Sequence, residues 1–181
     1  PNPEYGPVFG TVDFGGTNPH AVIFLQLLKQ DVPAWGYHQA SNEDPALILP
    51  AGSRIVFDEI YKAEIAPSAL CDLVLQRISY WRSFFPTFRV NKFFYDVQAK
   101  GARLEWAHHQ PPIILVNYAT KDVQLHISYM KGLFEDNKFW FNVSRCPMTC
   151  QEFESWHYPD QRTAMVDSPD VPVKDFDHAV D

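Results

Sequence analysis

The chain lacks several features that mark other classes of protein. It has no stretch near the roughly 18 uninterrupted apolar residues of a membrane span, since its longest apolar run, 21–25, ends at Gln26. The N-terminus shows neither the layout of a signal peptide nor an initiator Met, so we expect a segment of a longer protein. Internal repeats and low-complexity tracts are also missing, which excludes repeat and fibrous architectures.

Cysteine is scarce. The three cysteines, Cys71, Cys146 and Cys150, make a poor disulfide framework. Cys71 falls in an amphipathic helical pattern and is expected to be a small buried hydrophobe. Cys146 and Cys150 are four residues apart with no second Cys/His pair at zinc spacing, so we expect no zinc site. A reducing, intracellular setting fits this usage best.

What is present favours one packed domain. Of 181 residues, 46% are hydrophobic and 15% aromatic, which suffices for a buried core and argues against disorder. The net charge of −7 argues against indiscriminate nucleic-acid binding. Its distribution is uneven: residues 77–103 hold six basic residues and one acid, Asp96, whereas residues 152–181 hold eight acids and two basic residues. This pattern indicates either phosphate-binding charge beside a metal site or ordinary surface charge.

The hydrophobic periodicity predicts a mixed α/β fold. Strands are expected at 7–13, 21–28, 54–61, 90–96, 113–118 and 139–143, and helices at 68–81, 98–109, 123–134, 149–156 and from about 174. Residues 30–53 and 158–172 are expected to be loops. Ser68 is a plausible helix cap, and Thr149 with Glu152 has the spacing of a capping box. Three strands in an antiparallel meander, followed by strands alternating with helices, predict a mixed sheet flanked by helices.

Two predicted strands end in an aspartate after an apolar run, at Asp13 and Asp96. An acid at the carboxyl end of a buried strand is held at the rim of the sheet, where open α/β sheets place their sites. If the two strands are neighbours, the carboxylates lie close together, and a divalent cation such as Mg²⁺ or Mn²⁺ would offset their repulsion. The alternative for each is an ordinary turn or cap residue.

The chain ends in a third acidic element, with Asp177, His178 and Asp181. On a helix, spacings of three and four residues place all three side chains on one face. That face would bring a further carboxylate to the same metals, with His178 at a ligand water or the substrate. The alternative is a solvated histidine in an acidic helix start that complements the helix dipole.

Four segments, 12–19, 57–61, 94–101 and 177–181, resemble the nuclease domain of the large terminases of tailed bacteriophages. The resemblance covers essentially the whole chain and implies a ribonuclease H-like fold. It implies that residues 1–181 form a single nuclease domain, the C-terminal part of a longer terminase. The Gly-rich phosphate loop of the family's ATPase motor does not occur, so the ATPase domain is absent from this chain.

The resemblance also implies an activity and a site. The family cuts concatemeric viral double-stranded DNA during genome packaging, in the cytoplasm of the host cell, as a two-metal-ion endonuclease. Its catalytic acids correspond to Asp13, Asp96 and Asp181, with Asp177 as a further metal ligand and His178 as the family's histidine. The expected cofactors are two divalent ions, Mg²⁺ or Mn²⁺. The expected partners are DNA, the terminase ATPase domain, the portal protein and the small terminase subunit, with no membrane.

Other residues have less defined roles. Lys100, Arg103 and Arg82 are the predicted DNA-phosphate contacts, with plain surface solvation as the alternative for each. A direct metal role for Glu59 is left open, because Asp58 and Glu59 should point to opposite faces of their strand. Two other functions are also left open: a resolvase or transposase-type nuclease of the same fold, and a non-catalytic domain that docks on the portal or another terminase subunit.

Overall fold

A computed structural model of the chain describes residues 1–15, 19–34, 47–95, 99–108, 113–117 and 123–155. Its elements, in chain order, are η1 Pro3–Tyr5, β1 Val8–Asp13, β2 His20–Leu27, β3 Val32–Pro33, β4 Ile48–Leu49, β5 Arg54–Lys62, α1 Pro67–Phe84, β6 Val90–Tyr95, α2 Lys100–His108, β7 Leu115–Asn117, α3 Val123–Glu135, β8 Phe139–Phe141 and α4 Pro147–Ser155. No helix of the described part has the length and apolar character needed to cross a membrane.

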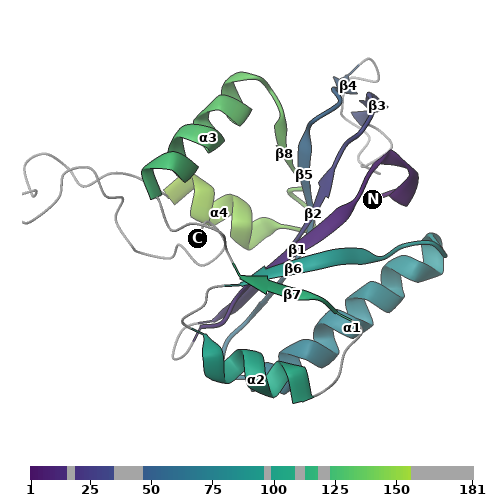
Figure 1. Ribbon diagram of the computed structural model, residues 1–181. Coiled ribbons are helices and arrows are strands. Elements are labelled where there is room, and N and C mark those ends of the chain that lie inside the picture. Colours follow the sequence, from purple (N-terminus) through teal and green to yellow (C-terminus); the bar gives the residue numbers. More distant parts are fainter. Residues whose placement is uncertain (16–18, 35–46, 96–98, 109–112, 118–122, 156–181) are drawn as a thin grey trace, which may run out of the picture.

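Six strands form one mixed sheet in the order β7-β6-β1-β2-β5-β8. The central strands β1, β2 and β5 pair antiparallel, whereas β6, β7 and β8 join them in parallel. Helices α1 and α2 lie on one face of the sheet and α3 and α4 on the other (Figure 1). The predicted meander, with parallel strands and helices on both sides, is therefore confirmed.

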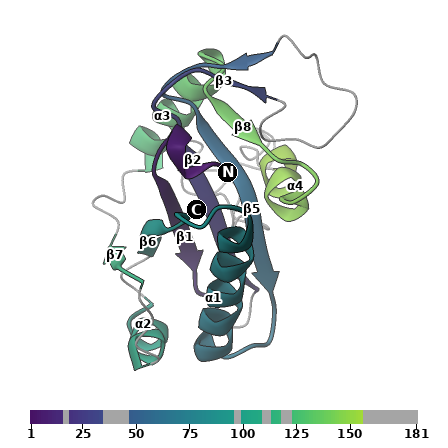
Figure 2. The same cartoon turned by 90° about the vertical axis from the view of Figure 1, so that its right-hand side faces the viewer.

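The main core lies between the sheet and α1. Phe24, Phe57 and Phe93 point to this face from three strands, are almost wholly buried, and make edge-to-face or tilted ring contacts with one another. Helix α1 lies along β5 in this layer (Figure 2) and adds Leu70, Val74, Ile78 and Trp81. These residues recur at three- and four-residue spacing, which is why the sequence pattern predicts this helix correctly.

Gly10 allows β6 to approach β1. A Cβ atom on Gly10 would collide with the ring of Phe93, which is itself fully buried and cannot move aside. The parallel pairing between the two strands is irregular at the same place, between Val8 and Gly10. Beyond it, the register runs regularly to Val12 opposite Tyr95. Glycine at this position therefore helps to fix which residues of β1 and β6 lie side by side.

Some predictions about the ends and loops were wrong. The expected loop 30–53 contains a small two-stranded sheet, in which Val32 pairs with Leu49, and both side chains are buried in the core. Ser68 does not cap α1: the helix begins one residue earlier, without a side-chain cap, and the Ser68 amide donates to Glu105 of α2 at 3.2 Å. The expected loop 158–172 and the helix from about 174 lie outside the described residues.

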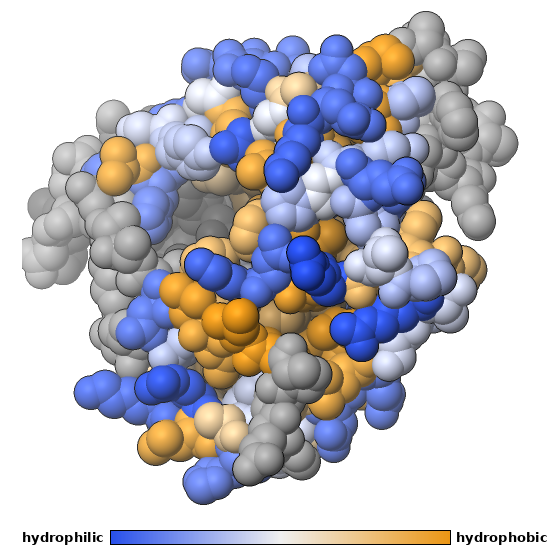
Figure 3. All heavy atoms as spheres, turned by 45° about the vertical axis from the view of Figure 1, so that its right-hand side comes forward, coloured by the Kyte–Doolittle hydropathy of each residue, from blue (hydrophilic) through white to orange (hydrophobic). Residues whose placement is uncertain are grey.

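Hydrophobic side chains reach the surface in several places. On the face shown in Figure 3, hydrophobic and hydrophilic residues are interspersed, and no single apolar patch covers it. The large exposed hydrophobic residues of the described part are Ile48, Tyr80, Phe84, Leu104, Ile114, Leu125, Tyr129, Phe134 and Val143. Such scattered exposure is ordinary for the surface of a folded domain and gives no evidence of an apolar partner on this side.

Candidate functional site

Asp13 is the last residue of β1, at the rim where several strands end. Its Cα pairs with Ala21 of β2, and Ala21 pairs in turn with Tyr61 near the end of β5. On the other side of β1, Val12 pairs with Tyr95, the last residue of the parallel strand β6. Asp13 is partly buried and follows the buried Val12. The expected position of Asp13 at the carboxyl end of a central strand is confirmed.

The other predicted acids lie outside the described residues. These are Asp96, Asp177, His178 and Asp181. Asp96 follows Tyr95 directly in the chain, so the strand that carries it to the rim is the neighbour of β1, as expected. Among the residues that the structure describes, no group of three or more His, Cys, Asp or Glu side chains could hold a metal ion. The convergence of the predicted metal ligands therefore stays a prediction.

Acidic side chains surround Tyr61 at the same rim. Its hydroxyl donates a hydrogen bond of 2.7 Å to Oε1 of Glu152, a buried residue of α4. Burial, this hydrogen bond, and the negative charges of Glu152, Asp13 and Glu59 together raise the pKa of the Tyr61 hydroxyl well above its usual range. Because three carboxylates act on one phenol, the potential at this end of the sheet is negative, which favours a cation.

Glu59 has a structural partner that the sequence did not indicate. Its Oε1 accepts from the amide of Met148, and its Oε2 accepts from both the amide and the hydroxyl of Thr149, at 2.7–2.8 Å. Glu59 thus caps the N-terminus of α4, where backbone N–H groups and the helix dipole favour an anion. The predicted capping box is wrong, because Thr149 and Glu152 are buried against β5 instead of bonding to each other.

Asp58, the neighbour of Glu59, points to the opposite face, as predicted. Its side chain is 0% exposed and lies between α1 and the segment after β8. Oδ1 accepts from Arg77, and Oδ2 accepts from Trp81 Nε1 at 2.7 Å and from Arg145 Nη2 at 3.5 Å. A bulge in the pairing of β2 with β5 turns Phe57 toward Trp81 as well. Sequence reasoning missed this network, although Arg77 and Trp81 share one helix face.

The predicted DNA contacts fall at two ends of the molecule. Lys100 and Arg103 are exposed on α2, and the Arg103 guanidinium lies 5.9 Å from the centre of the ring of Tyr95, at the rim that holds Asp13. Arg82 lies in the last turn of α1, donates Nε to the carbonyl of Phe88 at 3.0 Å, and lines a hollow by the start of β6. Lys100 and Arg103 therefore lie near the candidate site, whereas Arg82 lies at the opposite end of the strands.

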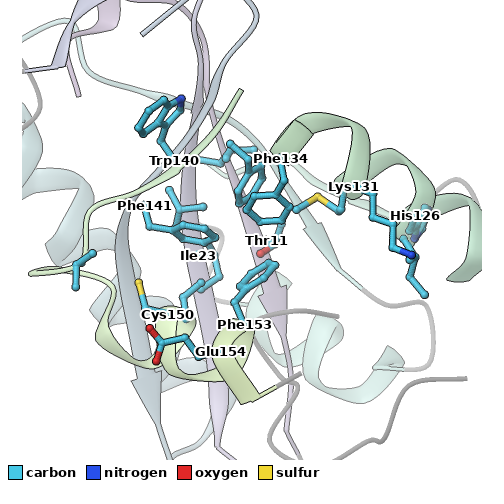
Figure 4. Close-up of a pocket in the computed structure, with 17 residues that line it drawn as sticks. Thr11, Ile23, His126, Lys131, Phe134, Trp140, Phe141, Cys150, Phe153 and Glu154 are labelled. Atoms are coloured by element: carbon cyan, nitrogen blue, oxygen red, sulfur yellow. The ribbon is translucent and has the colours of Figure 1, made fainter. Parts of the chain in front are cut away.

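A cavity of about 700 Å³ opens between the sheet and the helices α3 and α4. Ile23 and the rings of Phe134, Phe141 and Phe153 line it, with Lys131 of α3 and Glu154 of α4 at its margins (Figure 4). Thr11, two residues before Asp13 on β1, also contributes. The cavity is mainly apolar and borders the rim instead of forming part of the acidic site.

The histidines and cysteines form no second site among the described residues. His108 is exposed at the end of α2, and its neighbour His109 lies outside the described part. Cys71, Cys146 and Cys150 are free thiols. Burial and the nearby charges of Glu59 and Asp58 raise the pKa of the Cys146 thiol above its usual range. A thiol in such surroundings is poorly suited to bind a metal, because the ligand form is the thiolate.

Solved structures with this fold include several phage large terminases. The large terminase of a thermophilic bacteriophage, in complex with ATP-γ-S, has a TM-score of 0.69 and 17% identity, and covers 99% of this chain and 38% of its own length. The nuclease domain of the P22 large terminase reaches 0.66 at 16% identity, covering 99% of this chain and 79% of its own. The nuclease domain of g2p from bacteriophage SPP1, solved with bound Mn, reaches 0.61 at 16%, covering 97% and 82%.

These likenesses establish the fold. The chain spans 38% of the length of the full terminase from the thermophilic phage but most of the length of the excised nuclease domains. No protein-family model and no curated protein sequence matches the chain. The expected resemblance is confirmed at the level of structure: this chain has the ribonuclease H-like fold of the nuclease domains of phage large terminases.

Proposed function

We propose that the chain is a metal-dependent endonuclease that cuts concatemeric viral double-stranded DNA during genome packaging. The observation that carries the proposal is the position of Asp13, at the end of a central strand whose parallel neighbour leads directly into Asp96. The fold of terminase nuclease domains supports it. So does the negative potential at this rim, where Asp13, Glu59 and Glu152 all act on Tyr61.

The proposed site consists of Asp13, Asp96 and Asp181 as metal ligands, with Asp177 as a further ligand and His178 beside them. Carboxylate oxygens are the ligands that Mg²⁺ and Mn²⁺ prefer, so these residues fit two such ions. A bound pair of ions would activate water and stabilise the leaving oxygen of a phosphodiester. The presence of Mn in the SPP1 domain supports the choice of metal. In this account Asp13 orients the ions from the rigid end of β1.

The surrounding residues would position the DNA and the site. Lys100 and Arg103 project from α2 beside the rim, where their charges would bind backbone phosphates and leave the acids to the metals. Glu59 and Glu152 hold α4 against β5 through Thr149 and Tyr61. Because these two acids are engaged with α4, they would shape the rim without binding metal.

The wider role follows from the same proposal. We infer that residues 1–181 form one nuclease domain of a longer terminase, whose ATPase domain lies in another part of the protein. In that setting, DNA, the portal protein and the small terminase subunit would be its partners in the cytoplasm of the host cell. Residues 1–181 would supply the cutting activity alone.

Cleavage of plasmid DNA tests this function. The wild-type chain with Mn²⁺ should nick and linearise supercoiled plasmid, and Asp13→Asn or Asp96→Asn should reduce the rate at least ~100-fold, the loss typical of removing one electrostatic catalytic group, while the thermal unfolding midpoint stays the same. Full activity in both variants would sink the proposal. Linear duplex and a four-way junction are assayed in parallel, because strong preference for the junction would indicate a resolvase. A wild-type chain that neither binds Mn²⁺ nor cuts would indicate a docking domain.

A further inference from the structure

A second, basic hollow lies beside β5 on the face that carries α1. Its volume is about 430 Å³. Its polar lining residues come from three separate segments: Lys62, Gln76, Arg77, Tyr80 and Arg145. None of the described lining residues is acidic. Three cations around one hollow are notable in a chain whose net charge is −7.

One buried carboxylate holds two of these cations in place. Asp58 pairs with both Arg77 and Arg145, whose side chains remain 33% and 32% exposed. The Arg145 guanidinium also lies over the rings of Tyr80 and Trp81, at 5.1 and 4.8 Å from their centres. Fixing two guanidinium groups in this way lowers the entropy cost of binding a ligand, because the donors are already oriented.

The charges around the hollow do not balance. Asp58 supplies one negative charge against Lys62, Arg77 and Arg145, so the group carries two surplus positive charges. The Nε atom of Arg145 is buried and has no hydrogen-bond partner among the described residues. A planar guanidinium offers several N–H donors in a fork that matches phosphate oxygens. The hollow therefore has both the charge and the donors that an oxyanion requires.

The hollow reaches the rim that holds Asp13. Lys62 is the last residue of β5, and its Cα pairs with His20, next to the Ala21 that pairs with Asp13. Two strand spacings separate β5 from β1, which places Lys62 on the order of 10 Å from the end of β1. At about 3.4 Å of axis per nucleotide, that distance corresponds to about three nucleotides of a duplex.

We propose that this basic hollow binds a phosphate group of the DNA backbone a few nucleotides from the cleaved bond. The inference rests on the proposed nuclease function and adds a site to it, on a different element from Lys100 and Arg103. Arg77 and Arg145 contact the phosphate, and Lys62 contacts it from the rim. Phosphate contacts of this kind fix the register of the DNA without reading its sequence.

Duplex binding without metal tests the hollow separately from cleavage. Lys62 and Gln76 are both exposed and make no bond to Asp58, so Lys62→Gln combined with Gln76→Glu changes the charge and spares the buried network. The matched control is Lys29→Gln, an exposed lysine just after β2, at the other end of the strands. Fluorescence anisotropy with a labelled duplex of about three helical turns in EDTA, over a salt series, gives the affinity and its salt dependence.

The double variant should bind the duplex about tenfold more weakly, and its slope of log affinity against log salt should fall by about one, as expected for one lost phosphate contact. Lys29→Gln should match the wild type, and all unfolding midpoints should agree. Wild-type affinity and slope in the double variant would overturn the inference. If the wild-type chain cuts DNA but the double variant binds normally, only this inference fails; if the wild type neither binds nor cuts, the proposed function fails with it.

Discussion

Oε2 of Glu59 lies 2.8 Å from the amide nitrogen and 2.7 Å from the hydroxyl of Thr149, 90 residues later in the chain. This contact fastens helix α4 to strand β5 at a depth where both residues are nearly excluded from water. It also explains why Glu59, although close to the acidic rim, is engaged with a helix N-terminus. The carboxylate serves as a cap that reaches the helix from another element.

Replacing Glu59 should therefore affect stability. Glu59→Gln keeps the shape but removes the charge that the helix N-terminus favours, and we expect a loss of about 2 kcal/mol in the free energy of unfolding. Chemical denaturation measures it. Glu154→Gln on the exposed side of α4 is the control and should change stability by less than about 0.5 kcal/mol. Unchanged stability in Glu59→Gln, together with a lost affinity for Mn²⁺, would instead make Glu59 a metal ligand.

The buried charge of Asp58 leads to a second prediction. Asp58→Ala leaves Arg77 and Arg145 without their shared partner and Trp81 Nε1 without its acceptor. Breaking a buried pair from one side costs about 3 kcal/mol or more, which here is reduced because both arginines are about one-third exposed. A fall in the urea midpoint with an unchanged slope is expected. A variant as stable as the wild type would show that the network contributes nothing to folding.

Gly10 should tolerate no side chain. In Gly10→Ala the new methyl group meets the buried ring of Phe93, and neither β1 nor β6 can move aside without shifting the sheet. We expect a loss of about 1–3 kcal/mol in the free energy of unfolding, typical of overpacking. Gly132→Ala, on α3 with open space around it, is the matched control and should be neutral or stabilising. Equal stability in the two variants would contradict the close approach of β6 to β1.

The thiols should differ in reactivity. Cys71 and Cys146 are fully buried, whereas Cys150 is partly exposed. Burial, followed by the charge of Asp72, raises the pKa of Cys71 to about 11, and burial also raises the pKa of Cys150, helped by Glu59 and Glu154. At mildly alkaline pH a thiol reagent should therefore label Cys150 slowly and the other two only on unfolding, with a rate that rises with pH as thiolate forms. Rapid labelling of three thiols in the native protein would contradict the described packing.

Sequence patterns were most informative where they depend on neighbouring residues. The 3.6-residue periodicity of α1 and the strand-end position of Asp13 are local, and the structure confirms both. Cap assignments at Ser68 and Thr149 were wrong for a shared reason. Their backbone amides are bonded by carboxylates from other elements, Glu105 and Glu59, and partners that are distant in the sequence leave no local signal.

Short strands and buried charges were also hidden. Two residues each suffice for β3 and β4, which lie in a stretch whose proline and glycine content is typical of a loop. The pairing of Asp58 with Arg145 joins residues 87 positions apart, so a single sequence gives no reason to connect them. The metal ligands remain predictions, because four of the five proposed site residues lie outside the described part of the chain.

Mn²⁺ binding by titration calorimetry tests the central claim most directly. The wild-type chain should bind Mn²⁺ with a measurable heat, and Asp13→Asn should weaken that binding at least ~10-fold, because it removes a charged ligand from the rim. Asp136→Asn, an exposed acid paired with Lys138 in the turn after α3, is the control and should bind as the wild type does. Equal Mn²⁺ affinity in the wild type and in Asp13→Asn would contradict the account, because it would show that the acid at the end of β1 holds no metal.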